Sequence, residues 1–151
     1  MVRFTYKRRE IKLTMDKEQL REIVKGFFKA INEGDAEKVL GVYYHPDIKY
    51  WIPGNSKISG LHNLESLGSV GFELLKAFPE GLKIEVENIL IDGSNVSVTA
   101  TGRAEFSDGV QYDNEYHYFL RFEGEKIIEA REYMDTQKSV VMVEHANKIE
   151  K

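Results

Sequence analysis

The chain contains no cysteine among its 151 residues, so disulfide bonds and thiol chemistry are excluded. No apolar run is long enough to span a bilayer, and no segment has the pattern of a secretory signal peptide. Gly-rich phosphate loops, nucleotide-binding motifs and a nucleophilic serine with a base partner are missing as well. These absences predict a soluble, cytoplasmic protein that does not engage membranes.

An excess of positive charge is also missing. The chain has 25 acidic and 21 basic residues, and its formal net charge is -4. This balance argues against nucleic-acid binding. The four histidines show no metal-ligand spacing, and the pair Glu115-x-His117 is at most half a metal site. We therefore expect no metal and no cofactor.

What the chain does have is an ample supply of apolar and aromatic side chains. Hydrophobic residues make up 42% of the sequence, and it contains 8 tyrosines and 8 phenylalanines. A chain of this length forms one domain with a substantial core, and its aromatic content favours strands around an aromatic-lined interior. We expect this domain to span residues 16–151, preceded by an arm at residues 1–15 that is either frayed or an added strand.

Hydrophobic periodicity predicts helices first and a set of long strands afterwards. The predicted helices cover about 16–33, 35–44 and 64–78, with a terminal helix over 139–149. The predicted strands cover about 47–52, 82–91, 95–107, 110–122 and 126–135, with a loop through Gly60 after the first. This order indicates an α+β fold, in which a curved antiparallel sheet packs on three helices of the N-terminal half. Such a sheet forms a cone with one open mouth.

The segment Gln111–Thr136 carries an unusual density of tyrosine, asparagine and carboxylate side chains. Alternation puts Asn114, Tyr116 and Tyr118 on the same face as two apolar residues, Leu120 and Phe122. That face is predicted to be the inner one. Tyr116 and Tyr118 then either donate hydrogen bonds to a ligand or serve as core aromatics bonded to a local carbonyl.

Two carboxylates in the last strand, Glu132 and Asp135, are candidates for acid–base chemistry. A carboxylate among aromatic side chains gains a raised pKa and can act as general base or acid. Asp135 also stands where the terminal helix needs an N-cap, and Glu132 is equally placed for a cross-strand ion pair. A β-bulge in this strand decides which of the two faces inward, and the sequence does not reveal one.

Three further side chains are weaker candidates for ligand contacts. Alternation sends one of Tyr50 and Trp51 inward, where either one can form an aromatic wall or plain core. Arg103, with Glu105 two residues later, can orient a substrate or water. Its place beside the Asp108-Gly109 turn favours a solvated side chain instead.

Short motifs distributed along residues 16–140 resemble the SnoaL-like branch of the nuclear-transport-factor-2-like superfamily. They are Ala30–Asp35, Tyr43–Asp47, Pro53-Gly54, Ser59-Gly60, Gly124–Ile127 and Arg131–Thr136. The resemblance implies a cone-shaped curved sheet with three helices and a homodimer packed through the sheet. Members of the superfamily include polyketide cyclases, ketosteroid isomerases and limonene-epoxide hydrolases.

The resemblance also implies roles for individual positions. Ketosteroid isomerases carry a donor tyrosine where this chain has Phe27, which we expect at the pocket wall, and a base where it has Ile52. Their second donor falls near Tyr118. Epoxide hydrolases of this fold match Asp135 and Tyr50, and Arg103-x-Glu105 matches only with a shorter hairpin. In the cyclases a pocket side chain removes a proton next to a carbonyl, and Glu132 and Asp135 are its analogues here.

Two functions of different classes follow. The first is a cofactor-independent isomerase, cyclase or hydrolase that works by carboxylate acid–base chemistry on an apolar or aromatic, oxygen-bearing molecule. Asp135 or Glu132 is then the base, Tyr118, Tyr116 or Tyr50 the donor, and Asn114 orients the ligand or a water. The second is a non-catalytic ligand-binding or dimerisation module of the same fold.

Overall fold

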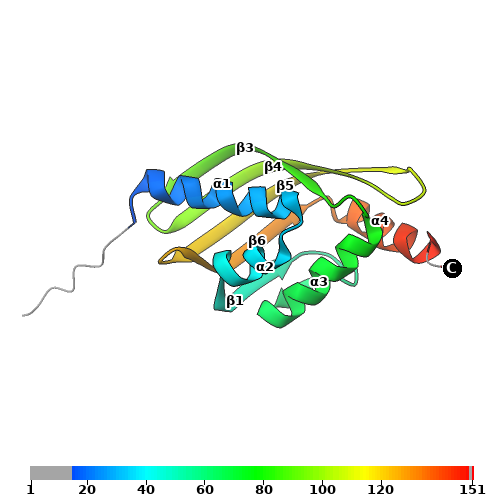
Figure 1. The fold of residues 1–151 in the computed structure, drawn as a ribbon, viewed down its shortest axis with the longest axis horizontal. Helices are drawn as coiled ribbons and strands as arrows, with labels where there is room; N and C mark the ends of the chain where they lie inside the picture. Colours follow the sequence, from blue (N-terminus) through cyan, green and yellow to red (C-terminus); the bar gives the residue numbers. More distant parts are fainter. Residues whose placement is uncertain (1–14, 150) are drawn as a thin grey trace, which may run out of the picture.

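The computed structural model describes residues 15–149 and residue 151. The arm predicted over residues 1–15 lies outside these residues, except for Met15, which packs partly buried against the core. Figure 1 shows helix α1 lying along one face of the sheet, with α3 and α4 gathered toward one end of it. The helical elements are α1 (Lys17–Glu33), α2 (Ala36–Lys38), the π-helical turn η1 (Val39–Tyr43), α3 (Leu64–Ala77) and α4 (Thr136–Ile149). The strands are β1 (Tyr44–Ile52), β2 (Gly60–His62), β3 (Lys83–Asp92), β4 (Asn95–Glu105), β5 (Gln111–Glu123) and β6 (Lys126–Met134).

Helix α1 forms where the sequence predicts it because its apolar residues recur at helical spacing. Leu20, Val24 and Phe27 are at most 1% exposed and face the sheet. Gly34 ends the helix at φ 70, and its backbone N–H bonds the carbonyl oxygens of Ala30 and Ile31. This left-handed closing conformation costs glycine little, so the chain turns sharply into α2.

The second predicted helix is shorter and more irregular than its sequence pattern indicates. It begins as α2, capped by Asp35, and continues through the wide turn η1. The first strand then starts at Tyr44, three residues earlier than predicted, and includes His45 and Pro46. The helical segment therefore ends before Pro46, as expected, and the proline itself belongs to strand β1.

The six strands form one sheet in the order β2-β1-β6-β5-β4-β3. The prediction of a purely antiparallel sheet is wrong for one pair, because β1 runs parallel to β6. The prediction of a loop through Gly60 is also wrong, since Gly60–His62 pairs with the end of β1 as strand β2. The α+β class and the order of the predicted helices are confirmed.

The pairing register shifts at three places in the sheet, one of them in the β1–β6 pair between Tyr44 and Lys49. The register between β3 and β4 shifts between Val86 and Asn88, and that between β5 and β6 shifts between Arg121 and Phe122. Each extra residue on one strand increases local twist and curvature. We call the face toward α1, α3 and α4 the inner face, and the other the outer face.

Buried side chains on the inner face form two clusters. The main core joins α1 to the sheet and includes Phe27, Val96 and Leu120. The end cluster lies under α3 and α4 and includes Phe78, Phe106 and Met142. Within the described part of the chain, no helix is both long and apolar enough to cross a membrane.

Candidate functional site

A cavity of about 370 Å³ opens between the main core and the end cluster. Its size falls within the usual range of small-molecule pockets. The walls come from the inner face of the sheet, the C-terminal end of α1, the α2–η1 segment, α3 and α4. Most lining side chains are apolar, among them Ile52, Leu67, Ile84 and Met142. The polar side chains that face it come mainly from the inner face of the sheet: Tyr44, Tyr50, Tyr112, Tyr116, Tyr118 and Glu132.

A bulge in β6 determines which carboxylate faces this cavity. Ile127 and Ala130 are both 0% exposed although they are three residues apart, because Ile128 is the extra residue of the bulge. Beyond it, alternation sends Ala130, Glu132 and Met134 inward. A strand without the bulge would continue from Ile127 through the odd positions and present Asp135 instead. Of the two predicted candidates, the structure therefore brings Glu132 to the cavity.

Glu132 lies among apolar and aromatic groups with one close partner. The hydroxyl of Tyr50 donates to its Oε2 at 2.7 Å. Burial raises the pKa of the carboxyl from 4.5 to about 7, while the hydrogen bond from Tyr50 partly offsets this by favouring the charged form. The carboxyl consequently exchanges its proton near neutral pH, which suits a general base or acid.

Two tyrosine hydroxyls near Glu132 are available to a ligand. Within the described residues, Tyr44 and Tyr118 have no hydrogen-bond partner for their hydroxyls, and no fully buried polar side-chain atom is left unpaired. Both residues line the cavity, so these hydroxyls open onto it. Burial, followed by the Glu132 carboxylate, raises the pKa of each phenol well above its ordinary value. They remain neutral donors at any working pH.

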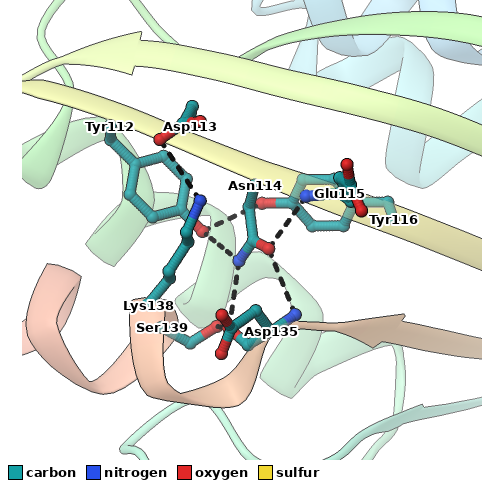
Figure 2. A network of polar contacts seen from close by, with 8 residues as sticks. All are labelled: Tyr112, Asp113, Asn114, Glu115, Tyr116, Asp135, Lys138 and Ser139. Atoms are coloured by element: carbon teal, nitrogen blue, oxygen red, sulfur yellow. Dashed lines mark hydrogen bonds and ion pairs between the residues drawn. The ribbon is translucent and has the colours of Figure 1, made fainter.

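A buried hydrogen-bond network connects the cavity to the start of α4 (Figure 2). The side-chain amide of Asn114 bonds the backbone of Asp135 twice, its Nδ2 donating to the carbonyl and its Oδ1 accepting from the N–H, both at 3.1 Å. Nδ2 also donates to the hydroxyl of Tyr112 at 2.9 Å, and that hydroxyl lies 3.1 Å from the hydroxyl of Tyr116. Asn114 thus supports the site from behind without lining it.

Asp135 caps a helix and does not reach the cavity. Its Oδ1 accepts the backbone N–H of Gln137 at 2.9 Å, in the second residue of α4, and its side chain is exposed. Of the two roles weighed for Asp135, the structure places it in the capping one.

Three other predicted ligand contacts also lie away from the cavity. Phe27 is 1% exposed and packs in the main core against Phe28, with ring centroids 5.0 Å apart. Trp51 faces outward, where it contacts Tyr133 at 5.5 Å between centroids. Arg103 is an exposed residue of β4, on the face opposite to Gly102 and Ala104, so it is solvated. The predicted residues that come together at the cavity are Tyr50, Tyr116, Tyr118 and Glu132.

Sequence reasoning missed two tyrosines of the cavity. Tyr112 has the same parity as Asn114 and Tyr116, so alternation extended two residues back would have found it. Tyr44 had no such signal. Pro46 argues against a strand at this point of the sequence, so the alternation of β1 could not be extended back to Tyr44.

The histidines are engaged in local contacts, and within the described residues no three metal-ligand side chains cluster. His117 pairs with Ser97 at 2.7 Å on the outer face, and His145 with Asp108 at 2.8 Å. His62 bonds the carbonyl oxygen of Ile58 at 2.8 Å. Two carboxylates line the cavity: Asp35, whose Oδ1 accepts the backbone N–H of Lys38 at 3.0 Å as the cap of α2, and Glu132. Glu132 is the one that lies among the tyrosines of the inner face.

Comparison with solved structures places the fold among known relatives. Bal32a from a soil-derived mobile gene cassette is 21% identical, with a TM-score of 0.73 over 83% of this chain and 96% of that one. A protein of unknown function with a cystatin-like fold from Xanthomonas campestris is 25% identical, with a TM-score of 0.72 over 82% and 96%. TerC, co-crystallised with polyporic acid, is 16% identical, with a TM-score of 0.72 over 83% and 98%.

Sequence comparison identifies the family directly. No curated protein sequence matches the chain significantly. The family model of the SnoaL-like domain, however, matches residues 24–130, which run from the middle of α1 to the centre of β6 and include α3. The chain therefore belongs to the SnoaL-like domain family.

Proposed function

We propose that this protein is a cofactor-independent enzyme that transfers a proton on an apolar, oxygen-bearing small molecule. One observation carries the proposal: the carboxyl of Glu132 has its pKa raised to about 7 in a largely apolar cavity that also presents neutral tyrosine hydroxyls. Perturbed carboxyls in clefts concentrate at functional sites.

The arrangement supports removal of a proton next to a carbonyl group. A base is most effective when its pKa lies near the working pH, as for Glu132. The negative charge then develops on the carbonyl oxygen, where preorganised donors stabilise it. The open hydroxyls of Tyr44 and Tyr118 are such donors, and burial keeps them neutral. Tyr50 holds the carboxylate in place.

The residues favour an isomerase or cyclase over an epoxide hydrolase. In the matching hydrolases an aspartate and an arginine converge on the substrate, whereas here Asp135 caps α4 and Arg103 is exposed. The apolar walls fit a largely hydrocarbon substrate, and the hydroxyls fit its oxygen atoms. We propose a ligand of this kind also because the structural neighbour TerC was co-crystallised with polyporic acid.

Hydrogen–deuterium exchange tests the proposal without knowledge of the natural substrate. A panel of cyclic and aromatic ketones is incubated with the protein in D2O, and loss of the proton next to the carbonyl is followed by NMR. We expect exchange with at least one ketone to be accelerated, and Glu132→Gln to lower that rate by roughly 100-fold or more. Glutamine keeps the size of the side chain and still accepts from Tyr50.

Asp135→Asn is the matched control, since it alters a carboxylate of the same segment that lies outside the cavity. It is expected to keep most of the exchange rate. Equal losses in the two variants, or equal retention, contradict the assignment of Glu132 as the base.

A non-catalytic ligand-binding module of the same fold is the second candidate. It is favoured by Phe27 in the core and Ile52 in the cavity wall, at the positions where related isomerases carry their donor and base. Tight binding of ketones or phenols, together with no exchange for any member of the panel, is the outcome that supports it.

We further propose that two copies pair through the outer aromatic patch, formed by Trp51, His117 and Tyr133. The ring centroid of Tyr133 lies 5.5 Å from that of Trp51 and 6.0 Å from that of His117. Tyr133 is 40% exposed. Aromatic side chains are enriched at protein interfaces. Light scattering coupled to size exclusion is expected to give a dimer for the native chain and a monomer for Tyr133→Arg; a monomeric native chain contradicts this proposal.

A further inference from the structure

The side-chain amide of Asn114 has a fixed orientation. Asn114 is 2% exposed, and its Oδ1 accepts from two backbone N–H groups, those of Glu115 at 2.9 Å and Asp135 at 3.1 Å. Exchanging the oxygen and nitrogen of the amide would set an NH2 group against two donors. The hydrogen-bond partners thus settle the orientation of the amide.

The orientation of this amide makes Tyr112 a hydrogen-bond acceptor. An amide nitrogen only donates, so at 2.9 Å the hydroxyl oxygen of Tyr112 accepts from Nδ2 (Figure 2). Accepting a hydrogen bond polarises the O–H of Tyr112 and makes it a better donor. Its partner at 3.1 Å is the hydroxyl of Tyr116.

The charge at Glu132 favours the same direction. Burial, then Tyr112, then the Glu132 carboxylate raise the pKa of Tyr116 well above its ordinary value, so the hydroxyl lies within the field of that carboxylate. A negative charge attracts the hydrogen ends of nearby dipoles. Both effects favour the hydrogen-bond direction from Asn114 through Tyr112 to Tyr116, with the last hydrogen directed toward the cavity.

We propose that Asn114 is a positioning residue, which sets the direction of the Tyr112–Tyr116 hydrogen bond so that Tyr116 presents its hydrogen to an oxygen atom of the ligand. This inference rests on the proposed function for its role in catalysis, since the oxygen it serves is the one that gains charge in proton transfer. The direction of the hydrogen bonds is testable on binding alone.

The same amide joins this donor to the position of α4. Asn114 bonds both backbone polar groups of Asp135, and α4 begins at the next residue. Ser139 and Met142 of α4 form part of the cavity wall. One buried side chain therefore fixes both the direction of a donor and the helix that closes the cavity beside it.

A coloured phenol provides the test. 4-Nitrophenol changes its absorbance on ionisation, so the ratio of ionised to neutral probe can be measured while it is bound. A donor hydroxyl in the cavity raises that ratio. All proteins are also made with Glu132→Gln, which removes the carboxylate charge. The result is then independent of the proton-transfer proposal, and each can fail without the other.

Asn114→Asp is expected to reverse the hydrogen-bond direction. In alkaline buffer the introduced carboxylate accepts from Tyr112, Tyr112 accepts from Tyr116, and the cavity loses a donor. We expect the bound ionised-to-neutral ratio to fall about tenfold, the loss of one hydrogen bond to a charged group. Tyr112→Phe deletes the connection without reversing it, leaves the Tyr116 hydrogen free, and is expected to change the ratio about twofold at most.

Combining the two substitutions separates hydrogen-bond direction from charge. With Tyr112→Phe in place, Asn114→Asp adds the same charge but has no hydroxyl through which to act, so most of its effect on the ratio should vanish. An equal fall with and without the Tyr112 hydroxyl overturns the proposal, because the charge alone then explains it. 4-Nitroanisole, which cannot ionise, reports any general damage to the cavity.

Tyr116→Phe keeps the proposal falsifiable if Asn114→Asp does not fold. Removing this hydroxyl takes away the donor itself and is expected to lower the bound ratio about tenfold while leaving the affinity for 4-nitroanisole largely intact. An unchanged ratio in this variant overturns the proposal.

Discussion

The inner and outer faces of the sheet carry similar residues in very different surroundings. On the inner face, Tyr116 and Tyr118 are at most 6% exposed, and Glu132 shares the cavity with them. On the outer face of the same strands, Tyr133 is 40% exposed and Arg121 pairs with Glu129 in solvent. The helices cover one face only, so burial raises the pKa of a carboxyl on that face. The raised pKa of Glu132 therefore depends on the covering helices as well as on the residue type.

The largest expected contrast between the faces is in stability. Leu120 on the inner face is 0% exposed, whereas Leu90 on the outer face is 70% exposed. Leu120→Ala is expected to lower the free energy of unfolding by about 2–5 kcal/mol, because it removes buried surface and leaves a void. Leu90→Ala is expected to change it by about 0.5 kcal/mol or less. Urea denaturation of both variants tests this, and similar losses contradict the one-sided burial.

The next effect concerns the pH dependence of stability. Burial raises the pKa of Glu132 from 4.5 to about 7, so the folded protein holds this proton more tightly than the unfolded chain does. The free energy of unfolding should therefore fall as pH rises from about 4.5 to about 7 and stay level above, with a total loss on the order of 2–3 kcal/mol. Urea denaturation across this window should show that component in the native chain and lack it in Glu132→Gln. Identical pH profiles would sink this prediction.

A smaller effect is expected at Gly102, which lies beneath a cavity tyrosine. A Cβ atom at this position would stand 2.5 Å from Cε2 of Tyr116 and 3.1 Å from Cδ1 of Ile84. Gly102→Ala should displace the Tyr116 ring and lower the free energy of unfolding by about 1–3 kcal/mol. Gly71→Ala is the control, since nothing lies within 4 Å and α3 gains up to about 1 kcal/mol from the better helix former. Thermal melts of the two variants should shift in opposite directions.

The smallest effect is expected from the outer-face ion pair. Nη2 of Arg121 lies 2.6 Å from Oε2 of Glu129, and the arginine side chain is 51% exposed. Arg121→Ala should lower the free energy of unfolding by less than about 1 kcal/mol, because solvent and salt screen exposed charges. A loss that is larger and insensitive to salt would show that this part of the outer face is not open to solvent.

The inner face of β5 could be predicted from the sequence because residues of a regular strand point alternately to its two faces, so one known buried residue assigns all the others. Leu120 and Phe122 identify the buried parity, and Asn114, Tyr116 and Tyr118 follow it without interruption. The order of helices and strands was predictable for the same reason, since each long element has its own apolar period.

The choice between the two carboxylates was not predictable, because it depends on one extra residue. Ile128 and its neighbour Ile127 are chemically identical, so nothing in the sequence marks which of them forms the bulge. The placement of Phe27 at the cavity wall followed from the resemblance to enzymes of other activities, and its surroundings in this chain differ. For Arg103, the solvated side chain that the neighbouring turn favoured is the one the structure has. Tyr44 was missed because its environment arises from pairing with a distant strand.

The parallel pairing of β1 with β6 has a consequence for the order of folding events. It joins Tyr50 to Glu132 across 82 positions of sequence, whereas β3, β4 and β5 are joined by short hairpins. Contacts between distant segments form slowly because a long loop must close first. Trp51, the only tryptophan of the chain, belongs to the same strand pair and stands opposite Arg131. We therefore expect its fluorescence to follow the last kinetic phase of refolding, and ligand binding to recover with that phase rather than with the hairpins.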